Sequence, residues 1–182
     1  MRLIIERDTH TESPLEGSLW NLVSFRDGAE PRDIGDDIAF WLDYFEHGDC
    51  RWSLQGEGSQ CQWDNSARAG LLIGDKAGLD YLKIPPEDRV NSARNMLNMY
   101  SSWLNGYVYE YSLVDPTPPC GHCGSAPSDT EFAGTWSDGW IDCEEMFKDI
   151  RSELAHSKEK VTEITGTAAW LAPYHEMKEE TA

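Results

Sequence analysis

The longest regular pattern in this sequence is an amphipathic segment between a pair of prolines and an Asn-Gly pair. Pro85 and Pro86 precede two acidic residues, which is typical of a helix start. Asn105-Gly106 is typical of a helix end. Apolar residues recur at helical spacing between these signals, at Val90, Ala93, Leu97, Tyr100 and Leu104. We therefore predict a helix with one continuous apolar face.

Short β-prone segments occur before and after this helix in the sequence, and turn signals such as Asp27-Gly28 and Gly74-Asp75 separate them. The predicted strands are residues 2–7, 20–26, 50–55, 60–64, 69–73, 107–114 and 161–165. The segments at 50–55 and 60–64 flank Gly56-Glu57-Gly58 and are expected to pair with each other. An antiparallel meander is the simplest topology.

Two further helices are predicted. In the first, over residues 34–47, apolar residues occur at helical spacing and Gly48 marks the end. Its apolar positions are Ile34, Ile38, Trp41, Leu42 and Phe45. The other helix begins at Asp142 with Glu145 as a capping box. Its apolar face comprises Cys143, Phe147, Ile150 and Leu154.

These elements predict an α+β fold, with an antiparallel sheet packed against about three helices. The length of 182 residues suits a single domain over 1–182. Residues 115–140 are rich in Pro, Gly and Cys and are expected to form an irregular insertion or a small appendage. Residues 176–182 are expected to be flexible.

The charge of the chain constrains its partners. Asp and Glu number 33 against 15 Lys and Arg, which gives a net charge of −18. Such a field repels a phosphate backbone, so direct nucleic-acid binding is disfavoured, whereas basic protein surfaces are attracted. The alternative is that the acidity only aids solubility. No apolar run reaches the ~20 residues of a membrane span, and no secretory signal is visible, so a cytoplasmic location and no membrane partner are expected.

The predicted helix over 34–47 carries acidic residues on the face opposite its apolar stripe. We assign this face and neighbouring acids to partner binding. The assigned residues are Asp33, Asp36, Asp37, Asp43, Glu46, Asp49 and Glu57.

Aromatic residues are numerous for a domain of this size, and Tyr and Trp are enriched in protein interfaces. The set comprises Trp52, Trp63, Trp103, Tyr107, Tyr109, Tyr111, Trp136, Trp140 and Trp170. The alternative for any single member is core packing. For the set we expect a protein interface, such as that of a homodimer.

Two patterns raise the question of a metal or a reactive thiol. Cys120-Gly-His122-Cys123 resembles half of a zinc site, with Cys143 as a third ligand and His122 or His156 as the fourth. The alternative is a Gly-rich turn with two reduced thiols, and no cofactor is our expectation. His47 lies close to Cys50 in sequence, but Cys50 occupies an inward strand position, so an inert thiol is favoured. We expect a protein that is not an enzyme.

Two stretches carry a resemblance. One runs from Trp52 to Asp64 (Trp-Ser-Leu-Gln-Gly-Glu-Gly-Ser-Gln-Cys-Gln-Trp-Asp) and continues through residues 69–73. The other joins Trp103-Leu-Asn-Gly-Tyr-Val-Tyr109 to the segment around Cys120 and Cys123. Together they resemble a family of small acidic proteins found in bacteriophages and mobile elements.

This resemblance implies an accessory protein that blocks a host defence, and the leading expectation is an anti-CRISPR inhibitor of a type II RNA-guided nuclease. The inhibitor would act as a DNA mimic and occupy a positively charged nucleic-acid channel. The alternatives are a small zinc-stabilised adaptor or regulatory module, and an enzyme that acts on a small molecule or nucleotide.

Overall fold

The computed structural model describes residues 1–26, 28, 37–59, 61, 63–114, 121–122, 132–137, 144–157 and 161–168. The chain divides into two compact units. Unit 1 comprises Met1–Thr11 and Gly106–Ala182, and unit 2 comprises Glu12–Asn105. The α+β class is confirmed, and the described residues contain three α-helices, as expected, but two four-stranded sheets in place of one. The prediction of a single domain stays a prediction.

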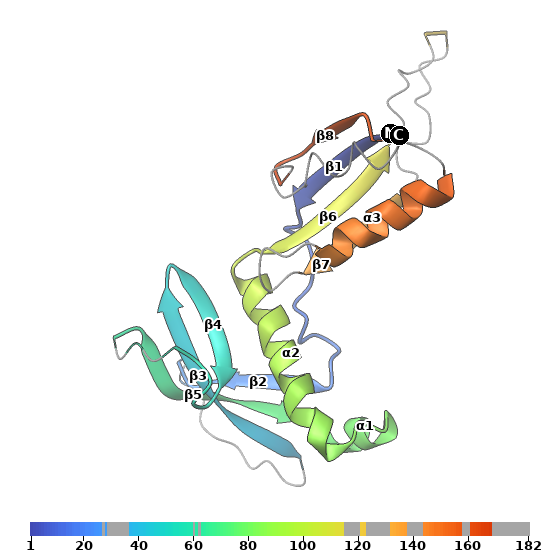
Figure 1. Cartoon of the computed structure of the whole chain (residues 1–182). Helices are drawn as coiled ribbons and strands as arrows, with labels where there is room; N and C mark the ends of the chain where they lie inside the picture. The colour runs from blue at the N-terminus through green and yellow to red at the C-terminus, as the bar shows by residue number, and fades with distance from the viewer. Residues whose placement is uncertain are drawn as a thin grey trace. The chain divides into compact units, whose positions relative to one another are not determined.

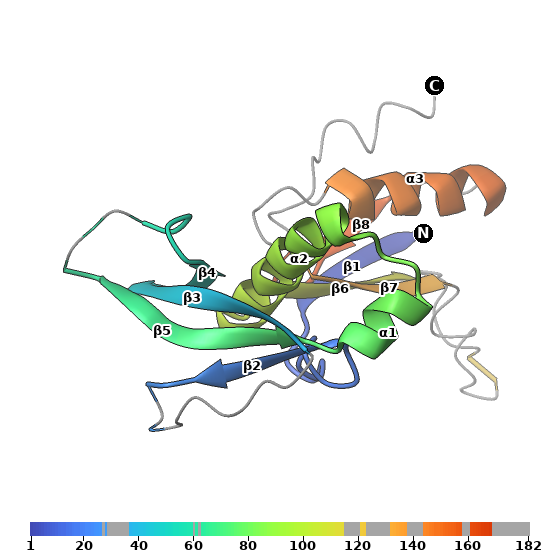
Figure 2. The ribbon, with the colours of Figure 1, turned by 90° about the horizontal axis from the view of Figure 1, so that it is seen from below.

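Unit 2 contains a sheet with the strand order β2-β5-β3-β4, in which all neighbouring strands are antiparallel. We call it sheet B. Helix α2 lies along one face of this sheet (Figures 1 and 2). The elements are β2 (Trp20–Ser24), β3 (Ile38–His47), β4 (Asp49–Leu54), β5 (Asn65–Gly74), α1 (Lys76–Tyr81) and α2 (Pro86–Leu104).

The predicted helix over residues 34–47 is wrong, because residues Ile38–His47 form strand β3. Apolar side chains in this segment fit both a helical and a two-residue period. Every second side chain from Ile38 to Tyr44 packs into the core under α2, and the strand pairs with both β4 and β5. This pairing outweighs the helical pattern. Ile34 lies outside the described residues.

The predicted strand over residues 60–64 is also wrong for the residues that the structure describes there, because Cys61, Trp63 and Asp64 are not in a strand. The returning strand β5 begins at Asn65 and pairs with β3 and β2, not with β4. The predicted helix between Pro86 and Leu104 is confirmed, with Ala93 and Leu97 buried.

Two glycines of β5 make room for large aromatic side chains in the core of unit 2. A Cβ atom at Gly74 would lie 2.6 Å from the ring of Trp20. A Cβ atom at Gly70 would lie 2.6 Å from the carbonyl oxygen of Val23 and 3.1 Å from the ring of Trp52. Trp20 and Trp52 are both buried, so the sequence of β5 and the aromatic core are matched to each other.

Unit 1 contains the second sheet, with the strand order β7-β6-β1-β8, in which β1 and β8 are parallel. Alternate residues of β1 and β6, such as Leu3 and Leu113, form a core with Phe147 and Ile150 of helix α3. The elements are β1 (Arg2–Arg7), β6 (Val108–Val114), β7 (Phe132–Ser137), α3 (Glu144–Ser157) and β8 (Glu163–Thr165).

The predictions for unit 1 are largely confirmed where residues are described. Strands occur within 2–7, 107–114 and 161–165, and the apolar side of α3 is buried. The proposed start of this helix at Asp142, with Cys143, lies outside the described residues, as does the tail at 176–182. The segment 115–140 contains strand β7, so it is not wholly irregular. Across the described parts of the chain, no helix combines the length and the apolar character needed to cross a membrane.

Candidate protein-binding site

The acidic helix face expected around residues 36–46 does not form, because β3 is a strand. Asp37 lies immediately before β3 and Glu46 lies near its end. A strand rises ~3.3 Å per residue, so these two residues lie about 30 Å apart. They cannot contribute to one compact acidic patch. Asp33 and Asp36 lie outside the described residues.

Asp43 is buried and serves the fold of unit 2. Its carboxylate accepts hydrogen bonds from the backbone N–H groups of Gly56 (2.8 Å) and Arg68 (3.0 Å). The register between β3 and β5 shifts at this position, and Arg68 has a φ of 52°. The Asp43 carboxylate therefore stabilises two backbone segments, the irregular position of β5 at Arg68 and the turn after β4 at Gly56. Because it is buried and occupied by these bonds, it is not available to a partner.

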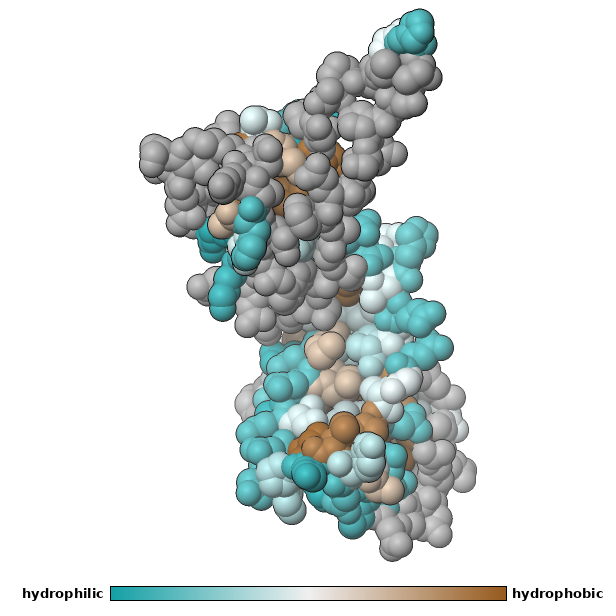
Figure 3. All heavy atoms as spheres, turned by 90° about the vertical axis from the view of Figure 1, so that its right-hand side faces the viewer, coloured by the Kyte–Doolittle hydropathy of each residue, from teal (hydrophilic) through white to brown (hydrophobic). Residues whose placement is uncertain are grey.

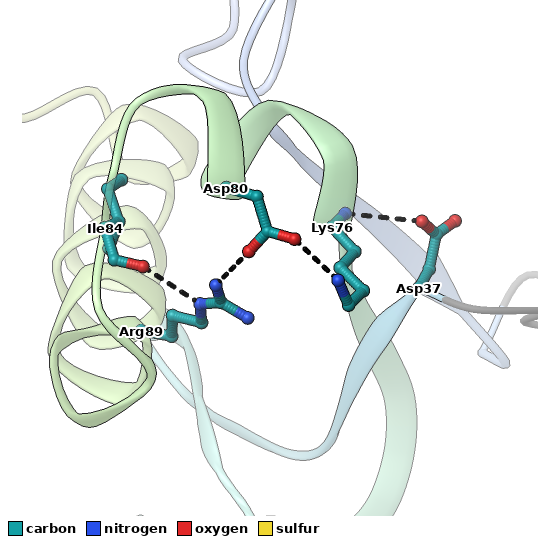
Figure 4. A network of polar contacts seen from close by, with 5 residues as sticks. All are labelled: Asp37, Lys76, Asp80, Ile84 and Arg89. Carbon is teal, nitrogen blue, oxygen red and sulfur yellow. Dashed lines mark hydrogen bonds and ion pairs between the residues drawn. The ribbon is translucent and has the colours of Figure 1, made fainter.

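Asp37 belongs to a polar network at the corner between α1 and α2 (Figure 4). The backbone N–H of Lys76 donates to Asp37, and the Nζ of Lys76 lies 2.5 Å from Asp80. Arg89 also contacts Asp80 and donates to the carbonyl oxygen of Ile84. Hydrogen bonds from Lys76 and then Arg89 lower the pKa of Asp80.

Beside this network, Tyr81 is 84 % exposed and Leu82 is 58 % exposed. Figure 3 shows an apolar area surrounded by hydrophilic residues on the side of unit 2 that bears α1. Such a small area is common on protein surfaces and does not by itself indicate a site.

Glu57 is engaged by Arg94 of α2 through two hydrogen bonds of 2.8 and 2.6 Å. The hydrogen bonds from Arg94 lower the pKa of the Glu57 carboxyl group. This ion pair joins the loop after β4 to α2. Among the other described acids assigned to partner binding, Glu46 and Asp49 are exposed at the junction of β3 and β4.

Glu46 and Asp49 lie on the tight β3–β4 turn, where the two strands are joined through Gly48 with a φ of 82°. We define the hairpin end of sheet B as Arg26, Glu46, His47, Asp49, Trp63 and Asp64. Arg26 pairs with Glu46 at 2.8 Å and lies 3.8 Å above the ring of Tyr44.

The half-buried Cys50 is held away from His47. The backbone N–H and carbonyl of Cys50 are both bonded, at 2.7 Å, by the side-chain amide of Asn105. Burial, followed by a hydrogen bond with the Cys50 thiol, raises the pKa of Tyr44 well above its usual value. Glu46 is the cross-strand partner of Cys50 and Asp49 is that of His47, so Cys50 and His47 project to opposite faces. This geometry agrees with the expected inert thiol.

The loop before β5 brings three polar side chains together on the other side of the hairpin end. The Cys61 thiol donates to Asp64 at 3.2 Å, and the Nδ1 of His47 lies 3.2 Å from the same carboxylate oxygen. Backbone hydrogen bonds from Asn65 to Cys61 and from Glu46 to Asp64 close the turn. The loop is therefore tied both to β3 and to itself.

Trp63 lies on this tied loop, and 85 % of the residue is exposed. An indole presented on a fixed turn, next to the carboxylate of Asp64, is typical of a binding anchor. Sequence reasoning counted Trp63 among the aromatics but placed it in a strand. Its position between a Gly-rich turn and a strand was the signal available for a loop.

The expected zinc ligands Cys120, Cys123 and Cys143 lie outside the described residues. Of the two candidate fourth ligands, His122 is exposed in a turn, and the Nδ1 of His156 is 2.8 Å from the carbonyl oxygen of Ser152. Within the described ranges, no three His, Cys, Asp or Glu side chains form a group that could hold a metal ion. The zinc site stays a prediction.

Comparison with known proteins leaves the function to be inferred from the chain itself. No family model matches this chain, and no curated protein and no solved structure is significantly similar to it.

Proposed function

We propose that this chain is a phage or mobile-element accessory protein that binds and inhibits a basic nucleic-acid-handling protein of a host defence. The specific target that we propose is a type II RNA-guided nuclease. The single observation that carries the binding role is Trp63, which is 85 % exposed on a hydrogen-bonded turn. Its surroundings and the charge of the chain indicate what it binds.

The net charge of −18 favours a positively charged partner. RNA-guided nucleases hold nucleic acid in such positive channels. Long-range attraction would raise the association rate, and the attraction would weaken as salt increases. The charge therefore sets the class of partner and the speed of encounter.

The contact residues that we propose differ from those first assigned. Asp43 is buried, and Asp37 and Glu57 are engaged within unit 2. We propose instead that Trp63 is the central anchor, and that the exposed carboxylates of Glu46 and Asp49, which project to opposite faces of the same hairpin end, supply negative charge at the periphery of the contact. A buried aromatic anchor surrounded by polar residues is the usual anatomy of a protein interface. In this way the hairpin end would occupy a groove that otherwise binds polynucleotide.

Inhibition of DNA cleavage by purified type II nuclease–guide complexes tests the proposal, together with binding of the chain to the same complexes. We expect Trp63→Ala to weaken binding by at least 2 kcal/mol, the usual threshold for an interface hot spot, which is about 30-fold. Tyr81→Ala is the matched control, because Tyr81 is 84 % exposed but lies at the α1–α2 corner. Charge reversal at both Glu46 and Asp49 should slow association and flatten its salt dependence.

The outcomes separate the target from the site. If the wild-type chain binds no nuclease complex at low salt, the assigned target is wrong. If it binds and Trp63→Ala binds equally well, the target stands but the hairpin end is not the contact.

A further inference from the structure

The two edge strands of sheet B, β4 and β2, differ in the hydrogen bonds that their outward-facing backbone groups make. On the β4 edge, the Asn105 side chain bonds the backbone of Cys50, and the Ser101 hydroxyl accepts the N–H of Trp52 at 3.1 Å. Helix α2 thus closes this edge with side-chain hydrogen bonds. Edge strands that lack such protection are available for pairing with another strand.

The opposite edge strand, β2, is not closed in this way at Leu22 or Ser24 by any described residue. The hydrogen bonds from Asp75 to Leu19 and from Phe25 to Ala69 show that odd-numbered residues of this segment bond to β5. The N–H and C=O groups of Leu22 and Ser24 therefore point away from the sheet. No residue in the described part of the chain forms a hydrogen bond with these four groups.

The sequence of β2 also lacks the usual devices that block an edge. Residues Trp20–Ser24 are Trp-Asn-Leu-Val-Ser, with no charged residue and no proline. In a chain with 26 % charged residues, this uncharged edge is a place where two copies can approach without directly opposed carboxylates. Val23 and Phe25 are both half-buried, so part of their apolar surface remains to be covered.

We infer that β2 is a homodimer surface, on which a second copy of the chain pairs its own β2 in antiparallel orientation. A two-fold axis beside Val23 would place Leu22 opposite the second copy's Ser24. Each of these residues would then donate its N–H to the C=O of the other, so that four hydrogen bonds satisfy all the outward groups. The pairing would join two four-stranded sheets into one of eight strands. This inference does not depend on the proposed target.

The stoichiometry in solution tests the inference, measured by sedimentation as a function of concentration. We expect the wild-type chain to approach twice its mass of 20.6 kDa, and Ser24→Pro to remain at the mass of one chain. The outward N–H of Ser24 takes no part in pairing with β5, so proline removes a dimer contact without removing a bond within sheet B. A wild-type chain that stays monomeric at the highest attainable concentration, or a Ser24→Pro variant that dimerises equally, overturns the inference.

Two further measurements guard against a misfolded variant. Ser24→Lys should also abolish the dimer by placing charge on the edge, whereas Ser66→Lys, at an exposed position of β5, should not. In the unmodified chain, hydrogen exchange at the amides of Leu22 and Ser24 should slow as concentration rises. Exchange at these amides that is unaffected by concentration, while the chain dimerises, would place the dimer surface elsewhere.

Discussion

Replacement of Asp43 by asparagine is expected to destabilise the protein, although it changes only one atom of the side chain. The carboxylate accepts two backbone hydrogen bonds, at 2.8 and 3.0 Å, from Gly56 and Arg68. An amide has one acceptor oxygen, and its NH₂ group would face a second donor. One bond would be lost and the other would no longer be assisted by charge.

The magnitude follows from these contacts. A hydrogen bond to a charged group contributes about 1.5–3 kcal/mol net, and a buried donor left without a partner adds to the loss. Because Gly56 and Arg68 are themselves exposed, water can reach the freed N–H group, so we expect the lower part of this range, about 2 kcal/mol for Asp43→Asn. Asp43→Ala, which removes both bonds, should cost about 3 kcal/mol.

Urea unfolding at neutral pH measures this loss. With a denaturant slope of about 2 kcal/mol per molar, the midpoint should fall by about 1 M for Asp43→Asn. Glu12→Gln is the control, because Glu12 is exposed and its replacement should change stability by less than about 0.5 kcal/mol. An unchanged midpoint for Asp43→Asn would mean that the carboxylate does not hold the two segments. If Asp43→Asn folded with unchanged stability but no longer bound the target, Asp43 would belong to the contact residues after all.

Two further predictions concern the α1–α2 corner. Lys83 has a φ of 57°, a conformation that glycine adopts without strain, so Lys83→Gly should stabilise the protein by about 0.5–1 kcal/mol in thermal unfolding. Lys83→Ala retains a Cβ atom and should give no such gain. Asp80→Asn should lower the unfolding temperature at pH 7. The pKa of Asp80 is depressed from 3.8, so its stabilisation exists above that pH and is lost as the pH falls through the folded-state value. The difference from the wild type should therefore disappear in acid, and a difference that persists would show that the ion pairs with Lys76 and Arg89 are not its origin.

The parts of the fold that were predictable from sequence carry their signals locally. The helix between Pro86 and Leu104 has start and stop residues and a regular apolar face, and all of these lie within one segment. The error at residues 38–47 arose because apolar residues there fit two periods, and the choice depends on pairing with β4 and β5, which are distant in sequence. Helix α1 has only six residues, too few to show a period.

The candidate site was less predictable for the same reason. Charge alone identified Glu46 and Asp43 equally, but their environments are set by tertiary contacts. Glu46 is exposed at the β3–β4 turn, whereas Asp43 is buried and accepts a hydrogen bond from the backbone of Gly56 in the turn after β4. Trp63 shows the converse case, since its exposure depends on where the strand begins, and that boundary is fixed by the pairing of Asn65 with Phe45.

The negative charge of the chain should act in opposite directions on the two contacts that we propose. Attraction between the hairpin end and a basic target is screened by salt, so binding should weaken as salt increases. Two copies that each carry −18 repel each other, so pairing through β2 should strengthen under the same conditions. Sedimentation of the free chain and titration of the target across one salt series therefore test the electrostatic argument from both sides. A homodimer that weakens with salt would indicate an attractive charge contact between copies, which the uncharged strand Trp20–Ser24 does not contain.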